Sequence, residues 1–347
     1  MIHLFDRAML APLDNWTLID DAEGGSNEQV LTLCLGANFY FADGHTPEKR
    51  KALAQCVNKL QDIYGEHLRW CIGTVGRTKR YKKTDAASHI VTASDRVQIG
   101  EVCGSLDPDS ADEYRISYLA RPVWDPQKAC SELTVRLPAK AENLDVLRSI
   151  FVDFCRVLQP LQAMGGVLSA TAWDSYSWQP QEYALSKHFF GVLVGVHEFL
   201  IRKMKSGIHS PTWLLALNPQ WYARIGGDAG LAALNEPSVL AQHYSAGVIL
   251  QAGSYPDPLP VEEGLPVFWR KYNAWLKPLR IPDIDCLHTA ALDFEQQFDE
   301  VTTRMWYERM DEGAQWPPTA QGYEAKLKAM REEAEAKEAP PPAPEHQ

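Results

Sequence analysis

The chain has 347 residues, of which 45% are hydrophobic and 10% aromatic, and this composition excludes a disordered protein, because disordered chains lack the apolar surface that offsets the entropy of ordering. The net charge of −11, from 34 basic and 45 acidic residues, argues against direct binding to nucleic acid, whose affinity comes largely from basic residues that neutralise phosphates. The same charge suits a basic protein partner, although it is also typical of an ordinary cytosolic protein that acidity keeps soluble.

The first part of the chain predicts strands and helices in a mixed order. Residues 29–41 (QVLTLCLGANFYF) are rich in β-forming residues and predict a core strand. Thr46 as the N-cap and Pro47 at the first helical position predict a helix with one buried apolar stripe, and residues 69–74 predict the next strand. The one basic cluster, in residues 76–90, is interpreted as a solvated loop or hairpin, with nucleic-acid contact as the alternative.

The middle of the chain predicts two further strands, in residues 114–124 and 130–139. In the second, apolar and polar residues alternate with the period of a half-buried strand. A helix is expected over 143–163, stopped by the glycines at 165 and 166, and residues 167–174 predict the strand that follows.

The last part begins with a predicted long helix over 181–205, which is apolar nearly all round at its centre and is therefore expected to be deeply buried. Residues 238–253 predict two strands joined by a turn, and helices are expected over 268–280 and 293–310. From residue 313 the chain has little apolar stripe and ends in a proline-rich run, which predicts an exposed tail, partly helical and partly disordered.

Because several predicted strands adjoin one another in the sequence, the fold class expected is α+β, with an antiparallel or mixed sheet packed by several long helices around a single compact core. Three regions are predicted: an N-terminal arm over 1–28, the α+β domain over 29–312, and the tail over 313–347.

Cysteine usage and the apolar runs predict a cytoplasmic protein. The seven cysteines form no CxxC pair, so neither a disulfide framework nor a zinc site is expected. The longest apolar run, 189–201, contains His197 and Glu198 and is shorter than the roughly 20 residues that span a bilayer. The N-terminus carries Asp6 and Asp14 and no basic segment before a long apolar run, so no signal peptide and no membrane contact are predicted.

No standard catalytic or metal-binding arrangement is present in the sequence. Residues 73–79 (GTVGRTK) lack the Gly-Lys-Ser/Thr ending of a phosphate-binding loop, and no HExxH or GxSxG motif occurs. His188 and His197 are nine residues apart, which would place them on different faces of a helix. Paired acids such as Glu262 and Glu263 lie in turns, where acids are usually solvated. We therefore predict no catalytic residue, metal or cofactor.

Aromatic residues are the more informative feature. Residues 173–183 (WDSYSWQPQEY) place several aromatics in a polar, turn-prone stretch, and large aromatics with a polar group are favoured at protein interfaces. Trp269, Tyr272 and Trp275 are instead expected to pack in the core.

Four short segments, in this order along the chain, give a recognisable pattern; we call them the signature segments. They are Gly207 to Leu214, Gly226-Gly227, Ala252-Gly253-Ser254-Tyr255-Pro256, and Pro278-Leu279-Arg280. Together with the strand and helices around them, they resemble the family of bacterial type VI secretion immunity proteins over roughly residues 30–310. The pattern consists of structural residues and contains no catalytic signature.

The resemblance implies a cytoplasmic antitoxin that binds a cognate effector toxin and neutralises it. Some members of the family are encoded beside nuclease effectors of restriction-endonuclease-like type. A nuclease must present a basic groove to DNA, so an acidic protein can mask its active or DNA-binding surface by charge mimicry. The expected partner is therefore a basic nuclease domain.

Contact residues are expected in the acidic loop over 104–113 (GSLDPDSADE), with two aromatics as anchors. They are Asp107, Asp109, Asp112, Glu113, Tyr176 and Trp178. Two other functions remain open: an enzyme of unrecognised type that uses an acidic pair, and a structural component of the secretion machinery.

Overall fold

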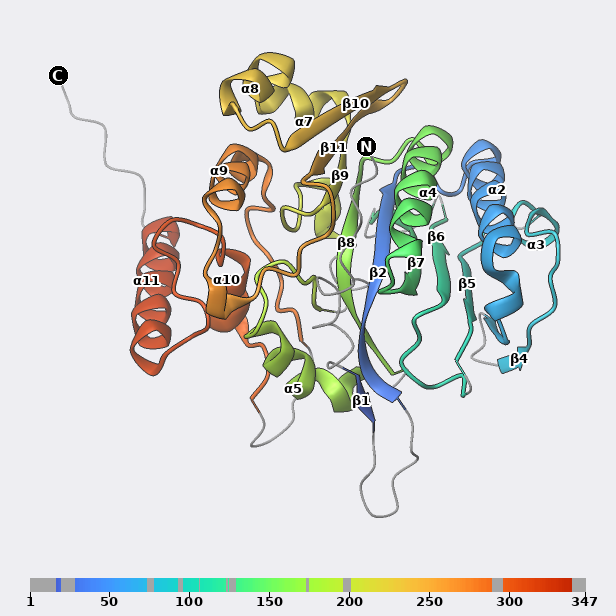
Figure 1. Ribbon diagram of the computed structural model, residues 1–347, viewed down its shortest axis with the longest axis horizontal. Coiled ribbons are helices and arrows are strands. Elements are labelled where there is room, and N and C mark those ends of the chain that lie inside the picture. Colours follow the sequence, from blue (N-terminus) through green and yellow to red (C-terminus); the bar gives the residue numbers. More distant parts are fainter. Residues whose placement is uncertain are drawn as a thin grey trace.

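The computed structural model describes residues 17–19, 29–73, 78–92, 96–105, 107–122, 124, 129–172, 175–195, 201–288 and 296–338. Its central element is β2 (Gln29–Phe41), the predicted core strand, which is buried along almost its whole length. Strands lie on both sides of β2, and helices pack against them (Figure 1). This large antiparallel sheet with its helices forms one compact arrangement, which confirms the predicted α+β fold class.

Eleven strands within the described residues form one sheet, in the order β10-β11-β9-β8-β2-β7-β6-β5-β3-β4, with β1 paired to the start of β2. Every strand pair in it is antiparallel. The remaining strands are β1 (Leu18–Ile19), β3 (Trp70–Gly73), β4 (Thr78–Arg80), β5 (Gln98–Cys103), β6 (Arg115–Ala120), β7 (Ser131–Pro138), β8 (Gln162–Thr171), β9 (Leu214–Leu217), β10 (Val239–Tyr244) and β11 (Gly247–Ala252). Part of the basic cluster forms the exposed strand β4, which pairs antiparallel with β3. This agrees with the hairpin interpretation for the described residues of the cluster.

Two helices connect parallel strands across the sheet. α2 (Pro47–Tyr64) leads from β2 to β3, and α4 (Glu142–Leu158) leads from β7 to β8 over β2. The Thr46 hydroxyl accepts a hydrogen bond from the Lys49 N–H, as expected of an N-cap. Figure 1 shows α2 and α4 side by side on one face of the sheet.

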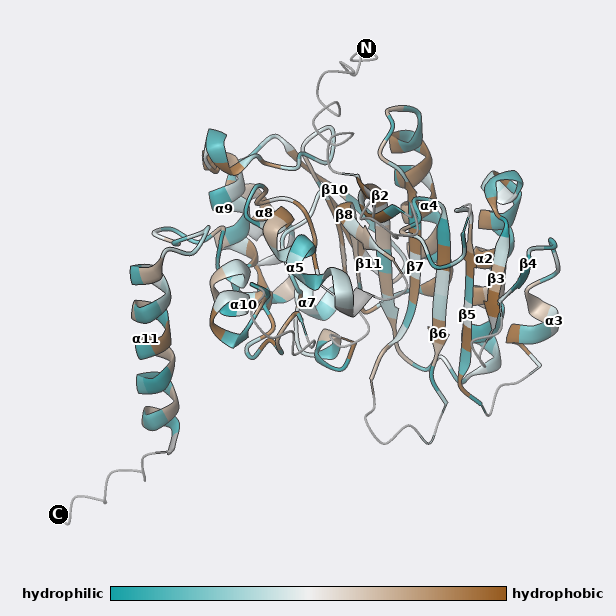
Figure 2. Cartoon of the chain, turned by 90° about the horizontal axis from the view of Figure 1, so that it is seen from below, coloured by the Kyte–Doolittle hydropathy of each residue, from teal (hydrophilic) through white to brown (hydrophobic). Residues whose placement is uncertain are grey.

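The helix-covered face holds the apolar core. Phe39 of β2 packs against Phe151 and Phe154 of α4, with ring centroids 5.3 and 5.6 Å apart. Leu133 of β7 lies opposite Phe39 in the register and is fully buried. In Figure 2 the hydrophobic colour is strong on α4 and β7, whereas α11 is largely hydrophilic.

The opposite face of the same strands is polar but also largely buried. Arg115 of β6 forms an ion pair with Glu101 of β5 at 3.1 Å, and Arg136 of β7 lies beside Arg115 in the register. Thr134, which alternation predicted to face away from the core, is only 7% exposed. The period-two pattern of β7 therefore marks two buried faces of different polarity.

The remaining helices follow mainly after β8. The α-helices are α3 (Ala87–Ile90), α5 (Ser175–Ser186), α7 (Pro219–Arg224), α8 (Gly227–Leu234), α9 (Val267–Leu276), α10 (Glu300–Tyr307) and α11 (Ala320–Glu338). The 3-10 helices are η2 (Gly65–His67), η3 (Lys203–Lys205), η4 (Val261–Glu263) and η5 (Lys277–Leu279). The expected two strands over 238–253 are the hairpin β10–β11, and the helix expected over 268–280 is α9 followed by η5.

The signature segments contact one another in the folded chain. The Ile208 N–H donates to the Leu279 carbonyl at 2.7 Å, and the Trp213 indole donates to the Gly253 carbonyl at 3.3 Å. Arg224, two residues before Gly226, donates to the Pro278 carbonyl at 2.7 Å. The signature segments thus form one structural unit, consistent with a pattern of structural residues.

The helix predicted over 143–163 ends earlier than expected. α4 stops at Leu158, because Gln159 adopts a left-handed conformation and Pro160 follows it. Residues 162–166, which were assigned to the helix and its stop, belong to β8. Gly165 does not terminate a helix; it lies in the strand, where an added Cβ would come within 3.2 Å of the Phe151 ring.

The long helix predicted over 181–205 was also wrong beyond Ser186. The apolar run after it is extended: the Leu193 N–H donates to the Val167 carbonyl at 3.0 Å, and the Ser169 N–H donates to the Leu193 carbonyl at 2.9 Å. Residues 196–200 lie outside the described residues. A short, wholly apolar run does not distinguish a buried helix from a buried extended segment, which explains the error.

The C-terminal elements are shorter or more ordered than predicted. α10 begins only at Glu300, where Asp299 and Thr302 form a capping box. Within the predicted tail, Trp316 is buried and its indole donates to the Ser186 carbonyl at 3.0 Å. α11 follows with mostly exposed side chains. No helix in the described part of the chain is long and apolar enough to cross a membrane.

Candidate partner-binding surfaces

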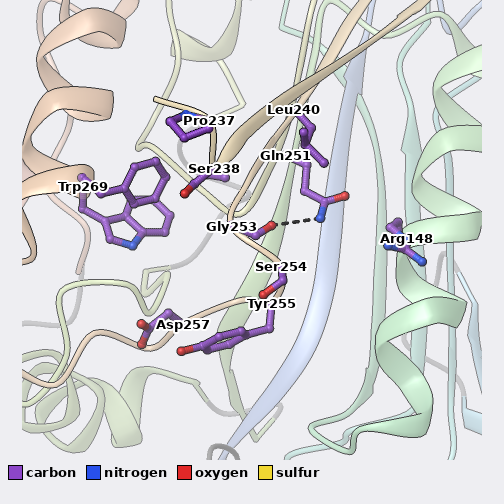
Figure 3. Close-up of a pocket in the computed structure, with 12 residues that line it drawn as sticks. Arg148, Pro237, Ser238, Leu240, Gln251, Gly253, Ser254, Tyr255, Asp257 and Trp269 are labelled. Atoms are coloured by element: carbon purple, nitrogen blue, oxygen red, sulfur yellow. Dashed lines mark hydrogen bonds between the residues drawn. The ribbon is translucent and has the colours of Figure 1, made fainter. Parts of the chain in front are cut away.

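A groove of about 540 Å³ opens between α4 and α9, over the hairpin β10–β11 (Figure 3). Arg148 of α4 lies on one side, and Phe268 and Trp269 of α9 lie on the other. The floor comes from β10, the end of β11 and the signature segment after it. The floor residues are Ser238, Leu240, Gln251, Ala252, Gly253, Ser254, Tyr255 and Asp257.

Hydrogen bonds fix the start of this floor. The Gly253 carbonyl accepts from the Gln251 amide at 2.9 Å, as Figure 3 shows, and from the Trp213 indole at 3.3 Å. The Gly253 N–H donates to the Ser238 carbonyl at 2.8 Å. Gly253 has φ +82°, a conformation that glycine adopts without steric cost, so the chain turns there and directs the next residues into the groove.

The far end of the floor is held against the apolar run before η3. The Gly191 N–H donates to the Pro258 carbonyl at 2.8 Å, and the Phe190 N–H donates to the Leu259 carbonyl at 2.9 Å. A Cβ on Gly191 would lie 2.4 Å from the Asp257 carbonyl oxygen, so this close approach requires glycine. Both ends of the segment that presents Tyr255 and Asp257 are therefore anchored.

The groove contains a carboxylate with little electrostatic compensation. Burial raises the pKa of Asp257, and among the described residues this is offset by the hydrogen bond that its Oδ1 accepts from the Leu259 N–H at 2.8 Å. Across the groove, Arg148 is paired with Asp145 at 2.7 Å. Burial, together with the charges of Asp257 and Glu263, raises the pKa of Tyr255. The groove is thus negatively charged on the side of Asp257.

The predicted acidic loop lies between β5 and β6. Asp112 is 3% exposed and organises the loop from inside: its carboxylate accepts from the N–H groups of Gly104, Ser105 and Tyr114, the last two at 3.1 and 2.8 Å. It therefore offers a partner almost no surface. This role was not visible in the sequence, where it looked like its neighbours.

The other three acids of the loop lie nearer the surface. Asp109 is exposed, and Asp107 and Glu113 are half-buried. The Asp107 carboxylate accepts from the Asp109 N–H at 2.9 Å, which closes a local turn. The loop is tied to the first residue of β2, because the Ala111 N–H donates to the Gln29 carbonyl.

The predicted aromatic anchors lie at the same end of β2. The Ala172 N–H donates to the Val30 carbonyl at 2.9 Å, and α5 begins three residues later. Trp178 is half-buried on α5, and the side chain of Tyr176 is outside the described residues. The structure thus brings the acidic loop and the start of α5 to either side of the first residues of β2.

A buried polar cluster joins β8, α5 and the segment before α10. Glu182 contacts the Ser169 hydroxyl and the His288 Nε2 atom, the latter at 3.0 Å, and His288 Nδ1 accepts from the Phe298 N–H at 3.2 Å. In a nucleophilic site the imidazole contacts the hydroxyl, whereas here the carboxylate lies between them. The cluster therefore connects elements and has no geometry for acyl transfer. The described residues also hold no group of three His, Cys, Asp or Glu side chains that could bind a metal.

Sequence reasoning missed the α4–α9 groove. Its residues come from segments far apart in the chain, and Trp269 was correctly expected in the core, being 5% exposed. The available signal was the signature segment Ala252 to Pro256, in which a strand ends in a glycine turn followed by an aromatic residue. That segment was interpreted as structural, and it forms the floor of the groove as well.

Comparison with known proteins identifies the family. The profile described as TsiV, type VI immunity for VRR-NUC, matches residues 52–310. Among solved structures, the T6SS protein PA0821 of Pseudomonas aeruginosa shares the fold with a TM-score of 0.78, at 23% sequence identity over 91% of each chain. A search of curated proteins found no match. Because the profile matches most of the chain, the protein belongs to the TsiV family of type VI immunity proteins for VRR-NUC.

Proposed function

We propose that this protein binds a VRR-NUC effector and neutralises it by masking the active or DNA-binding surface of the nuclease. The observation that carries the proposal is the match to the TsiV family over residues 52–310. The protein acts in the cytoplasm by binding and performs no catalysis itself. The order of groups in the Ser169–Glu182–His288 cluster speaks against acyl transfer by a serine nucleophile, and the enzyme that uses an acidic pair stays the alternative.

Charge supports masking of a basic surface. A nuclease needs positive charge where it holds the phosphates of DNA, and the net charge of −11 makes this chain electrostatically complementary to such a surface. Long-range attraction speeds encounter, and a few buried aromatic contacts then provide most of the affinity.

The surface proposed for this contact is the end of the molecule around the start of β2. Asp107, Asp109 and Glu113 supply negative charge there, and Asp112 holds their loop in shape. Trp178 and Tyr176 at the start of α5 are the proposed anchors. Because the carboxylate of Asp112 is bound by backbone N–H groups, the loop keeps its conformation in the absence of a partner.

The test combines DNA cleavage by the purified effector with growth of cells that produce it. Wild-type immunity protein is expected to stop cleavage and restore growth at roughly equimolar amounts. Reversing Asp107, Asp109 and Glu113 to lysine is expected to weaken inhibition at least about tenfold, because three favourable charges become repulsive. A wild-type protein that leaves cleavage unchanged would disprove the function.

A matched control separates the loop from general charge. Glu312, Glu324 and Glu335 are exposed acids in or before α11, and reversing them gives the same change in net charge. This control is expected to inhibit as well as the wild type. Equal loss of inhibition in both triple variants would show that net charge, and not the acidic loop, determines binding.

A further inference from the structure

The α4–α9 groove combines three features that suit a cationic side chain. Asp257 supplies a half-buried carboxylate that no described lysine or arginine neutralises by an ion pair. Tyr255 and Phe268, both half-buried, supply aromatic surface in the same groove, to which Trp269, at 5% exposure, adds little. The groove is open to a partner, because Leu240 on its floor is 59% exposed.

The geometry matches the two parts of an arginine or lysine side chain. Such side chains lay their methylene stem along apolar surface and keep the charged head on a carboxylate or an aromatic face. In Figure 3 the Tyr255 ring lies across the lower part of the groove with its hydroxyl toward Asp257, and Trp269 stands on the same side. The Tyr255 ring and the Asp257 carboxylate therefore lie on the same side of the groove, as a stem and a charged head require.

Two further observations favour an external cation over one from this chain. Arg148, on the opposite side of the groove, is engaged with Asp145 and lies away from Asp257 in Figure 3. Glu262 and Glu263 on η4 are exposed, and the charge of Glu263 reaches Tyr255, so the rim on this side is negative too. The segment that presents Asp257 is anchored at both ends, which reduces the ordering needed on binding.

We propose that this groove receives an arginine or lysine side chain of the VRR-NUC effector, with its charged head on Asp257 and its stem against the half-buried Tyr255 ring. The inference rests on the proposed function, since it names a docking site for that same partner. A DNA ligand is disfavoured, because the phosphates would meet the negative side of the groove.

The test measures binding of a catalytically inactive VRR-NUC effector to the wild type and to Asp257→Asn by calorimetry. The substitution removes the charge but keeps an oxygen for the Leu259 N–H, so the loop is expected to stay folded. The dissociation constant is expected to rise at least about 30-fold, as when one member of a buried charge pair is removed at an interface. Glu335→Gln, an exposed acid on α11, serves as the control and is expected to bind like the wild type.

A second variant and a second ligand keep the outcomes distinct. Tyr255→Leu removes the ring and is expected to weaken binding while Asp257 is intact. An acetylated arginine amide is expected to bind the wild type more tightly than its neutral citrulline analogue does, and to lose this preference in Asp257→Asn. Equal effector binding by the wild type and Asp257→Asn would disprove the groove as a docking site but would not contradict the proposed function. A wild-type protein that binds no effector overturns the proposed function and the assignment of the groove to that effector, whereas the arginine amide still reports whether the groove selects a cationic side chain.

Discussion

Glu182 shows how a single buried carboxylate can join three elements. Burial by itself would raise its pKa, but hydrogen bonds from His288, Ser169 and the Gly195 N–H outweigh burial and hold the pKa below the ordinary glutamate value. A depressed folded-state pKa means that the ionised carboxylate stabilises the fold above the unfolded-state pKa, and that this stabilisation is lost as pH falls through the folded-state value. The cluster therefore contributes to acid sensitivity.

Replacing the Glu182 carboxylate by its neutral isostere tests whether the folded-state pKa is lowered, as assigned here. Glu182→Gln is expected to lower the free energy of unfolding by about 1–2 kcal/mol at neutral pH, because hydrogen bonds to a charged group become bonds to a neutral one. Urea unfolding at neutral pH and near pH 4 should show the difference from the wild type shrinking in acid. A difference that grows as pH falls would contradict the assigned pKa direction. The exposed substitution Glu335→Gln is the reference.

At the scale of elements, Asp311 connects α9 and η5 to the chain that follows α10. Arg280, the last residue of the signature segments, donates to both oxygens of Asp311 and lies over the Tyr307 ring, 5.6 Å from its centroid. Lys277 donates to the same carboxylate at 2.9 Å. The two cations differ in exposure: the Arg280 side chain is 9% exposed and that of Lys277 is 58% exposed.

This pair allows a matched comparison at one carboxylate. Arg280→Met is expected to destabilise the protein by about 3 kcal/mol, because it leaves the half-buried Asp311 without its most buried cationic partner. Lys277→Met is expected to cost less than about 1 kcal/mol, because solvent screens an exposed ion pair. Chemical denaturation of both variants measures the difference. Equal losses would show that burial does not set the strength of these contacts.

Elements with strong local signals were predictable, and those defined by distant contacts were not. The start of α2 was readable because Thr46 and Pro47 form a local cap, and β10–β11 because its two short strands flank a turn. The helix predicted around Leu193 was wrong because hydrogen bonds to β8 hold this segment extended. Such contacts produce no hydrophobic periodicity in the sequence.

The candidate sites divide in the same way. The acidic loop was visible as a cluster of acids, but the sequence could not show that Asp112 faces inward while Asp109 faces outward. The groove could not be predicted from the sequence, because Arg148, Leu240, Asp257 and Trp269 line one groove only when α4, β10 and α9 are in place. The resemblance carried by the signature segments therefore predicted the family, and the location of the groove required tertiary contacts.

For the whole molecule, the net charge of −11 predicts how salt affects the association rate, wherever on the chain the effector binds. Attraction between this acidic chain and the basic surface proposed for the effector would act over distances that salt shortens, with a Debye length of roughly 10 Å at 0.1 M salt and 3 Å at 1 M. The association rate constant is therefore expected to fall about tenfold or more between low and high salt, while the dissociation rate constant, set by short-range contacts, changes little. Stopped-flow or surface-based kinetics with the inactive effector measures both constants.

The variants should change different rate constants. Reversal of Asp107, Asp109 and Glu113 should lower the association rate at low salt and flatten its salt dependence. Asp257→Asn should act mainly on dissociation, because the Asp257 carboxylate is half-buried and is proposed to contact the bound side chain. A salt-independent association rate in the wild type would show that the acidity of this chain serves solubility and not recognition.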